Sequence, residues 1–455
     1  MPATELRDPI SHQKPSTISG EAHTNQTRVS IGIDAAVVAA HQVAVRGEVR
    51  EDFKVRSTLA GLAELTRRLQ PYAGAMVVAE PTAGTWLPLA HAVADAGCGI
   101  GFVANRDSAR LRKAIVGASK TDVIDADMLA HCEEILGVVT APVPPPGQIA
   151  LRRAMRRRHT ATVDAHRAES RLWALAAWAF PDLWRATGGH TLAQPLLGRW
   201  PHLEGLSRAR LSSISDLVAA HSRHQDPQRR AERIRDAAAG WARFWQGRLD
   251  LDALAWEVAA MLDDITVADQ RQTDATRHGI RLWQQHWPDD PVISIPGMGP
   301  ICSAAIRGWW GDATHFATAK AAVAHTGLNP SMWSSGLTVS PSRRITKQGP
   351  AELRLALYQA ANVARRHDPQ LAEHYRRLMT ERGHNHISAN TAIARKLACR
   401  AWAIATTGRA YQPRDLDGNP ISLSEATALA AGLAVPDDIR GRRRGLTRRG
   451  RLNPI

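Results

Sequence analysis

The sequence predicts an α/β domain followed by a mainly α-helical remainder, and three observations lead to this fold class. Residues 28–140 alternate short apolar runs, typical of buried strands, with segments of helical periodicity. A proline-rich stretch at residues 141–147 then interrupts both patterns. Beyond it, apolar residues recur mostly at helical spacing, beginning with a long arginine-rich segment from residue 151 to 180.

Composition limits the classes of function. A chain of 455 residues that is 44% hydrophobic can bury a sizeable core and divide into two or three domains. Its net charge of +15 predicts a polyanionic partner, with nucleic acid as the leading candidate. No apolar run approaches the roughly 20 residues needed to cross a membrane, and residues 1–20 lack a signal-peptide pattern, so we expect a cytoplasmic protein without a membrane partner. The four cysteines are far apart in the sequence, which argues against disulfides and thiolate zinc sites.

The first domain is expected over residues 28–146, after a polar leader of residues 1–27 that we expect to be disordered. Apolar residues 29–33, alternating residues 41–45 and a turn at Gly47 predict an antiparallel meander that ends near residue 57. A helix at 59–69, a strand at 75–79, a helix at 86–96 and a strand at 99–103 follow. The resulting order, βββαβαβα, is ribonuclease-H-like.

Acidic residues stand at three points of this domain. Asp34 and Glu80 each follow a predicted buried strand, and Asp122 and Asp125 lie about one helical turn apart. Four carboxylates that converge at the carboxyl ends of neighbouring strands could hold one or two divalent cations, as in a nuclease. The structural alternative makes Asp122 a helix N-cap and makes Asp34 and Glu80 turn residues. Asp127 is excluded from the set, because it points about 140° away from Asp122 on a helix.

Residues 147–285 are expected to form a helical coiled-coil arm with an insertion. Its first helix, at 151–180, carries an arginine cluster that either binds phosphate or is a solvated face. Its last helix is predicted over 251–283, and the mixed segment 182–250 lies between them. The arginines proposed to contact nucleic acid are Arg152, Arg153, Arg156 and Arg157.

Residues 286–408 are expected to form a second compact domain, mainly α-helical, with helices at 350–365 and 390–405. It opens on a turn resembling a helix-hairpin-helix, in which Gly297 and Gly299 would let backbone N–H groups approach a phosphate. Arg343, Arg344 and Lys347 are candidate phosphate contacts, although solvated loop charge explains each of them equally well. Residues 409–455 are expected to be a basic tail that orders only on nucleic acid.

Nine short motifs occur in one order along residues 28–408, and together they resemble the IS-one-ten family of bacterial transposases, also called DEDD or serine transposases. These motifs are Gly32-Ile-Asp34, Ala79-Glu-Pro-Thr82, Lys120-Thr-Asp-Val-Ile-Asp-Ala126, Ile295-Pro-Gly-Met-Gly299, Gly327-Leu-Asn-Pro330, Ser335-Gly336, Lys347-Gln-Gly349, Leu353-Arg354 and Ala394-Arg-Lys-Leu397.

The resemblance implies a RuvC-like domain, a coiled-coil arm and a transposase domain with a nucleophilic serine. It implies that Asp34, Glu80, Asp122 and Asp125 form an acidic tetrad for Mg²⁺ or Mn²⁺, and that the nucleophile is Ser335. The partners it implies are donor and target DNA, a structured guide called the bridge RNA, and further copies of the chain, as a dimer and as a tetramer when DNA ends are synapsed. The protein would then work at the nucleoid of a bacterial cytoplasm. The chain is longer than is typical of the family, mostly through residues 182–250 and the basic tail.

The residues alone leave alternatives open. Ser334 and Ser335 are barely separable without the Ser-Gly motif, in which Gly336 would allow close approach to a phosphate. A RuvC-like, structure-specific endonuclease would cut with metal-activated water and use Ser335 only as loop. A non-catalytic nucleic-acid-binding protein would use the carboxylates only as caps and turns.

Overall fold

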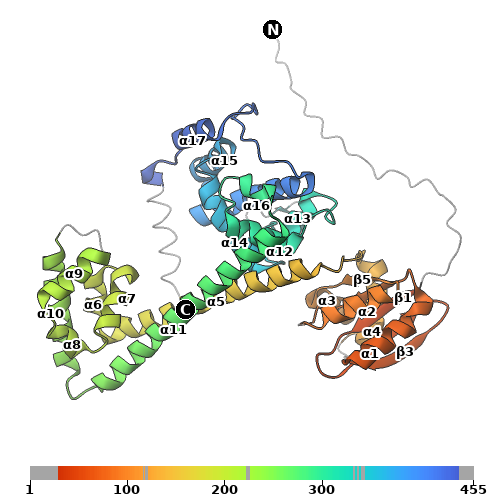
Figure 1. Ribbon diagram of the computed structural model, residues 1–455, viewed down its shortest axis with the longest axis horizontal. Coiled ribbons are helices and arrows are strands. Elements are labelled where there is room, and N and C mark those ends of the chain that lie inside the picture. The colour runs from red at the N-terminus through yellow and green to blue at the C-terminus, as the bar shows by residue number, and fades with distance from the viewer. Residues whose placement is uncertain are drawn as a thin grey trace, which may run out of the picture. The chain divides into compact units, whose positions relative to one another are not determined.

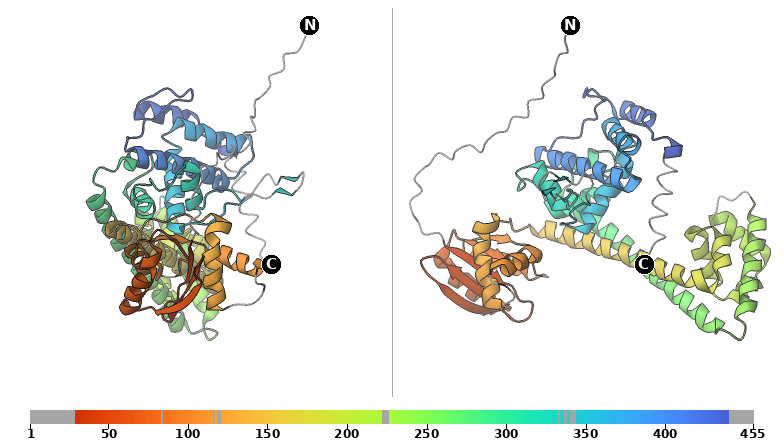
Figure 2. Two further views of the ribbon diagram at one scale, coloured as in Figure 1. Left: turned by 90° about the vertical axis from the view of Figure 1, so that its right-hand side faces the viewer. Right: turned by 180° about the vertical axis from the view of Figure 1, so that it is seen from behind.

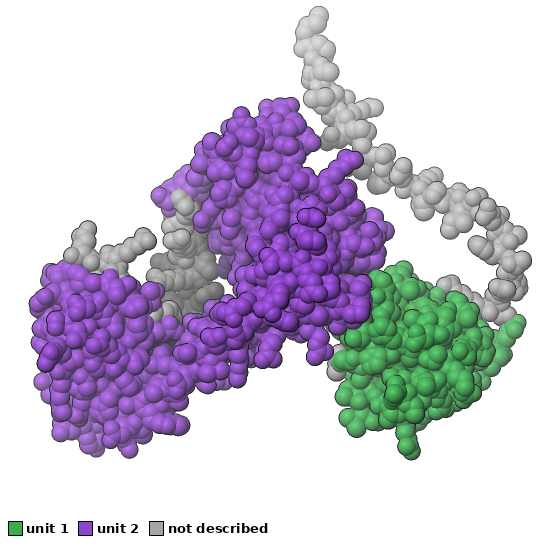
Figure 3. Space-filling model, viewed as in Figure 1, with its two compact units in different colours: residues 1–143 green, residues 144–455 purple. Residues whose placement is uncertain are grey.

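The computed structural model describes residues 29–439, except residues 83, 116, 118–120, 222–225, 332–333, 336–337 and 340–343. The expected leader, the last arginine run and Arg343 therefore lie outside the described residues. The chain divides into two compact units, residues 1–143 and 144–455 (Figure 3). The division falls within the proline-rich stretch, and each unit has its own hydrophobic core.

Unit 1 contains a five-stranded mixed sheet of order β3-β2-β1-β4-β5. Strands β1 (Ser30–Asp34), β2 (Ala40–Arg46) and β3 (Glu51–Arg56) form the expected antiparallel meander. Strands β4 (Met76–Ala79) and β5 (Gly99–Phe102) extend the sheet in parallel with β1. The observed order β1-β2-β3-α1-β4-α2-β5-α3 agrees with the predicted βββαβαβα order.

Helices cover both faces of this sheet. On one face, α1 (Leu59–Leu69) and α2 (Trp86–Asp95) pack through Leu65 and Leu89 against Ile31 and Ile33 of β1. On the other face, α4 (Asp122–Leu136) packs through Leu129 against Val78 of β4. Helix α3 (Asn105–Ile115) contacts α4. Successive residues of a strand point to opposite faces of the sheet, so each strand residue faces either α1 and α2 or α4.

Gly32 permits the contact between β1 and α4. A Cβ atom at this position would lie 2.0 Å from the backbone oxygen of Ala126 and 2.4 Å from the backbone nitrogen of Ala130. Backbone atoms cannot rotate away as a side chain can, so an added methyl group must push the helix off the strand.

We therefore expect Gly32→Ala to lower the free energy of unfolding of unit 1 by about 1–3 kcal/mol or more. Hydrogen exchange followed by mass spectrometry should show loss of protection in β1 and α4. Gly84→Ala is the matched control, because nothing lies within 4 Å of the Cβ it would add. Equal protection in the two variants would contradict the close approach of helix and strand.

Two long helices begin unit 2. Helix α5 (Pro146–Ala179) and helix α11 (Leu251–His286) pack side by side (Figures 1 and 2). Their contacts are antiparallel, since Arg158 Nε donates to Thr276 Oγ1 over 3.0 Å while Gly147 lies against His286.

The buried residues of this helix pair follow a seven-residue repeat. In α5 the repeat is occupied by Ala161, Ala165, Ala168, Leu172, Leu175 and Ala179. In α11 it is occupied by Leu254, Val258, Ile265, Ala268, Ala275 and Gly279. Alternating steps of three and four residues are the pattern of a coiled coil.

Residues between the two long helices form a separate helical group. It consists of α6 (Pro181–Thr187), α7 (His190–Arg199), α8 (Leu203–Ser207), α9 (Leu211–His221) and α10 (Pro227–Trp245). Its core is shared with the end of α5 and the start of α11, through residues such as Leu172, Leu196, Ile234 and Val258. The segment expected to be mixed is thus almost entirely helical.

Most of the remaining helices share a second core that includes Leu151, Met298, Trp310 and Leu397. The remaining elements are η2 (Pro291–Ser294), α12 (Pro300–Trp310), α13 (Ala319–Thr326), β6 (Ser334–Ser335), β7 (Thr338–Val339), α14 (Ala351–Ala364), α15 (Pro369–Thr380), α16 (His386–Thr407) and α17 (Leu423–Gly432). No helix within the described ranges is both long enough and apolar enough to cross a membrane.

Two features of the chain after α11 differ from the prediction made from the sequence. The turn at residues 295–299 follows the short 3-10 helix η2 rather than an α-helix, so one arm of a helix-hairpin-helix is missing. Residues 409–455 are not wholly a tail, because α17 contacts α15 and Val435 is buried in the shared core. A capping box of Ser422 and Glu425 starts α17.

Candidate functional site

Asp34 and Glu80 lie side by side at the carboxyl ends of neighbouring strands. Strands β1 and β4 are parallel, with Ile33 opposite Ala79, so the next residues along both strands are the two carboxylates. Gly32 and Val78 face α4, and side chains two residues apart on a strand lie on the same face of the sheet. Asp34 and Glu80, each two residues further along, therefore lie on the α4 side. Both residues are half-buried.

The surroundings of Cys132 agree with that placement. Burial, and next the charge of Glu80, raise the pKa of this α4 thiol to about 11. Glu80 therefore lies close to α4 in space, although 42 or more residues separate it from that helix in the chain.

Asp122 and Asp125 lie in the first turn of α4. The N-cap is Thr121, whose Oγ1 accepts a hydrogen bond from the Ile124 backbone nitrogen over 3.2 Å, so neither aspartate is needed as a cap. Asp122 is exposed, whereas Asp125 is half-buried and pairs with Arg112 Nη1 over 3.1 Å. Asp127, which the sequence excludes, pairs instead with Arg46.

Helix α3 supplies partners for two of the four carboxylates. The hydroxyl of Ser108 donates to Glu80 Oε1, and Arg112, one turn later, pairs with Asp125. Sequence reasoning assigned no role to either residue, although their spacing of four puts them on one helix face. Across the described part of the chain, no three side chains of His, Cys, Asp or Glu are arranged as a ready metal-binding group. The structure thus brings Asp34 together with Glu80, while Arg112 compensates the charge of Asp125.

The second predicted site lies in the loop between α13 and α14. Ser335 belongs to β6, and its register partner is Thr338 of β7. The base of this loop is closed by main-chain bonds: Ser331 N donates to Arg344 O over 3.0 Å, and Lys347 N donates to Gly327 O over 3.0 Å.

Arg354 of α14 stabilises the same base of the loop by hydrogen bonds. Its Nη1 donates to three backbone oxygens, those of Gly349 at 2.6 Å, Lys347 at 3.2 Å and Thr326 at 3.3 Å. Gly349 allows the tight closure, since a Cβ there would lie 2.1 Å from the backbone oxygen of His325. The sequence motifs on either side of the serines therefore build a fixed base, and no role was predicted for Arg354.

The arginine cluster of α5 divides into two pairs. Arg152 Nε donates to Gly308 O over 2.9 Å, and its guanidinium lies 4.7 Å from the ring centre of Trp309. Arg156 lies over the same ring and pairs with Glu352 at 3.3 Å. Burial, and next the charge of Arg156, lower the pKa of Arg152 to about 10. These contacts hold α5 against α12 and α14. Of the four arginines only Arg152 is half-buried, whereas Arg153, Arg156 and Arg157 are exposed.

Comparison with known proteins decides the family. The model described as "Transposase IS116/IS110/IS902 family" matches residues 289–376, and a second transposase model, for the DEDD transposases of IS110, matches residues 31–181. The chain belongs to the IS110 family of transposases. The uncharacterised 43.6 kDa protein of insertion element IS110 from Streptomyces coelicolor is 26% identical over 345 residues, covering 74% of this chain and 83% of that protein. The transposase for insertion sequence element IS1328 from Yersinia enterocolitica is 32% identical over 139 residues, 29% of this chain and 41% of that protein.

The two matches cover the candidate sites of this IS110-family chain and leave other parts out. Asp34, Glu80, Asp122 and Asp125 lie within the first match, and Ser335 lies within the second. Residues 182–288, which include the helices α7–α10 and all of α6 except its first residue, belong to neither match.

The glycines of the turn before α12 differ in their surroundings. Gly297 has φ +87°, and a Cβ there would lie 2.4 Å from the backbone oxygen of Ala360, so this glycine is required for packing on α14. Gly299 is the N-cap of α12, with nothing within 4 Å of an added Cβ. A shallow pocket of about 470 Å³ lies at this turn and is lined by both glycines. A second shallow groove, of about 490 Å³, lies on α5.

Proposed function

We propose that the protein is an RNA-guided transposase of a bacterial insertion sequence that cuts and rejoins DNA through a covalent phosphoserine. The observation that carries the proposal is the parallel register of β1 and β4, which sets Asp34 beside Glu80 on the side of the sheet that α4 covers. Membership of the IS110 family supports it.

The acidic residues have the chemistry that Mg²⁺ or Mn²⁺ requires. Asp34, Glu80, Asp122 and Asp125 offer carboxylate oxygens, which hard divalent cations prefer. The guanidinium of Arg112 beside Asp125 indicates that positive charge is favourable at this edge of the sheet. A bound ion would supply charge neutralisation for a DNA phosphate and for the departing oxygen. Arg112 and Ser108 would hold the carboxylates in place until the ion binds.

Ser335 is proposed as the nucleophile. Its Oγ would form a bond to phosphorus while one phosphorus–oxygen bond of the DNA backbone breaks, and the serine proton would leave for solvent or a nearby base. Rejoining reverses these bonds on another strand end, so no external energy source is needed. The base held by Arg354 supports this role, because Arg354 bonds to the backbone of Thr326 and of Lys347, on the two sides of the segment that contains Ser335.

The proposed partners follow from the same chemistry. Donor and target DNA are the substrates, and a structured bridge RNA selects them. Strand exchange requires several cut ends to be held together, so we propose a dimer that pairs into a tetramer, acting at the nucleoid in the cytoplasm. The exposed candidates for nucleic-acid contact among the described residues are Arg153, Arg156, Arg157, Gly299, Arg344 and Lys347.

A denaturing gel tests the proposal directly. Protein, RNA transcribed from the element flanks, Mg²⁺ and labelled junction DNA should produce a slow, protease-sensitive band that EDTA abolishes. Asp34→Asn and Glu80→Gln should each reduce this band by about a hundred-fold or more. Asp127→Asn is the matched control, since Asp127 pairs with Arg46, and it should keep the band. Freely migrating cut DNA would overturn the serine mechanism in favour of a nuclease that uses metal-activated water.

A further inference from the structure

We propose that the arm binds an unpaired segment of RNA on an aromatic and basic strip formed by Arg167, Arg171, Trp178, Phe244 and Arg248. The strip combines α5 with the end of α10, and α10 lies outside both family matches. This inference rests on the proposed function for its partner, because a guide RNA offers unpaired bases. It assigns a role to a helical group that the family resemblance leaves without one.

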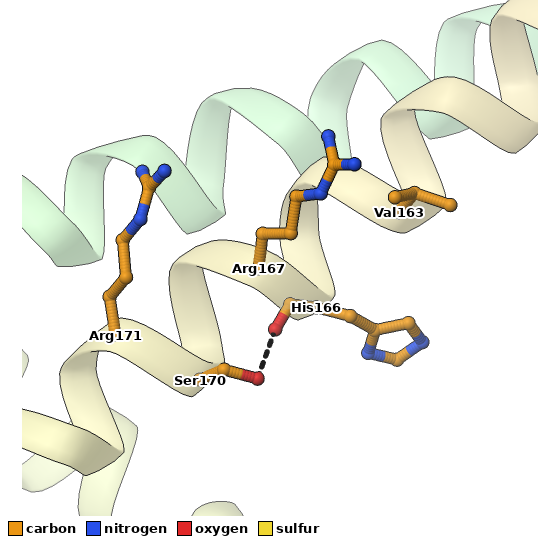
Figure 4. Close-up of a pocket in the computed structure, with 5 residues that line it drawn as sticks. All are labelled: Val163, His166, Arg167, Ser170 and Arg171. Carbon is orange, nitrogen blue, oxygen red and sulfur yellow. Dashed lines mark hydrogen bonds between the residues drawn. The ribbon is translucent and has the colours of Figure 1, made fainter.

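The α5 part of the strip is one exposed face of a helix. Arg167, Arg171 and Trp178 are spaced by four and seven residues, so they lie in a row about 16 Å long. Arg167 and Arg171 project from α5 in the same direction, beside the shallow groove on this helix (Figure 4). Arg167 pairs only loosely with Asp164, at 3.4 Å, and within the described ranges Arg171 makes no ion pair. Trp178 is 51% exposed, at the end of the row.

The row continues onto α10 through ring contacts. Trp178 meets Trp245 edge to face, with 6.0 Å between ring centres, and Trp245 meets Phe244 at 4.7 Å. Trp245 is anchored by a hydrogen bond of 2.7 Å from Nε1 to the Ala179 backbone oxygen. Phe244 remains 46% exposed, and the guanidinium of Arg248 lies 4.8 Å from its ring centre. The structure therefore holds exposed aromatic rings in fixed positions between arginines.

This composition favours unpaired RNA over a protein partner. Cores of protein–protein interfaces are depleted of charged residues, whereas here arginines flank the aromatic rings on both sides. Exposed aromatic rings beside arginines suit single-stranded nucleic acid, whose bases stack on the rings while phosphates meet the guanidinium groups. The bases of duplex DNA are already stacked, so they cannot use such rings, whereas RNA loops present splayed bases. The net charge of +15 favours the same partner.

Fluorescence anisotropy of the full chain with a labelled oligouridylate of about twelve nucleotides tests this proposal. Trp178→Ala and Phe244→Ala should each weaken binding by roughly five- to one-hundred-fold, the effect of losing one stacked base. Removing both Arg167 and Arg171 should lower the slope of log K against log salt by about 1.4, the contribution of two phosphates on a single strand. Trp256→Ala is the matched control, because Trp256 is 74% exposed but lies outside the strip, and it should bind like wild type.

Several outcomes would overturn the proposal. The first is no binding of oligouridylate by the wild type, and the second is an effect of Trp256→Ala equal to that of the strip variants. The third is a loss of affinity for duplex DNA in the strip variants equal to their loss for oligouridylate. A changed oligomeric state in sedimentation velocity, with oligouridylate binding intact, would instead identify the strip as a contact between copies of the chain. Failure of the transposase proposal has a separate signature, because it removes the DNA adduct of the wild type without affecting oligouridylate binding.

Discussion

Ser335→Ala is expected to abolish the covalent protein–DNA adduct, a loss of at least about a thousand-fold relative to wild type. Alanine has no oxygen that can bond to phosphorus. The acidic residues assist the attack by the serine, so without it they cannot form the adduct. The measurement is the protease-sensitive band on a denaturing gel, with RNA, Mg²⁺ and junction DNA present. Binding of the same DNA, measured without Mg²⁺, should stay within about two-fold of wild type, since only one hydroxyl is lost.

Ser334→Ala is the matched control for this prediction, because the two serines are adjacent in β6. Only one of the two hydroxyls can bond to the phosphorus in a given strand cut, so the two variants distinguish between them. An adduct formed by Ser335→Ala but not by Ser334→Ala would move the nucleophile by one residue. Adduct formation by both variants would exclude both serines as the nucleophile.

Asp290→Ala is expected to lower the free energy of unfolding by about 3–5 kcal/mol, the largest effect on stability that we predict. Asp290 and Arg307 form a buried ion pair with side chains 0% and 5% exposed. The carboxylate also accepts from Trp283 Nε1 over 2.8 Å and from the Val292 backbone nitrogen over 3.1 Å. Removing the carboxylate leaves a buried guanidinium that has no second ion-pair partner among the described residues.

The measurement is the urea midpoint of the full chain, together with hydrogen exchange in α12. Asp274→Ala is the matched control, because its pair with Arg277 is more than half exposed on both sides, at 56% and 65%, and its loss should cost less than about 1 kcal/mol. The double variant Asp290→Ala with Arg307→Leu should recover part of the stability. Equal midpoints for Asp290→Ala and Asp274→Ala would contradict the importance of the buried pair.

The local pattern of apolar residues was sufficient to predict the order of the strands along unit 1 and the two long helices. Residues 29–33 and 75–79 carry continuous apolar runs because both faces of the sheet are covered, and such runs are readable without a structure. The helical group between α5 and α11 was less readable, because its helices are short and separated by turns. Helix α17 was missed because its apolar residues are mostly alanines.

The sequence allowed the carboxylates of the candidate site to be predicted, but not the residues that contact them. Asp34, Glu80, Asp122 and Asp125 stand out because each is a carboxylate at an element boundary. Ser108 and Arg112 do not stand out, because a serine or arginine on a helix is usually a surface residue, and Arg354 stood out only as part of a motif to which no role was assigned. In the arginine cluster of α5 the structure adds contacts that the sequence did not predict, since Arg152 and Arg156 lie over the ring of Trp309 and Arg156 pairs with Glu352.

The sequence by itself determined the two-part architecture, the family and the identity of the acidic and serine candidates, because these depend on periodicity and on short motifs within single segments. Only the tertiary structure decided which groups meet: Arg112 with Asp125, Arg354 with the backbone at the base of the serine loop, and Arg152 with Trp309. A pairing between segments far apart in the chain depends on strand register and helix packing. Those are set by the whole core rather than by the residues that meet.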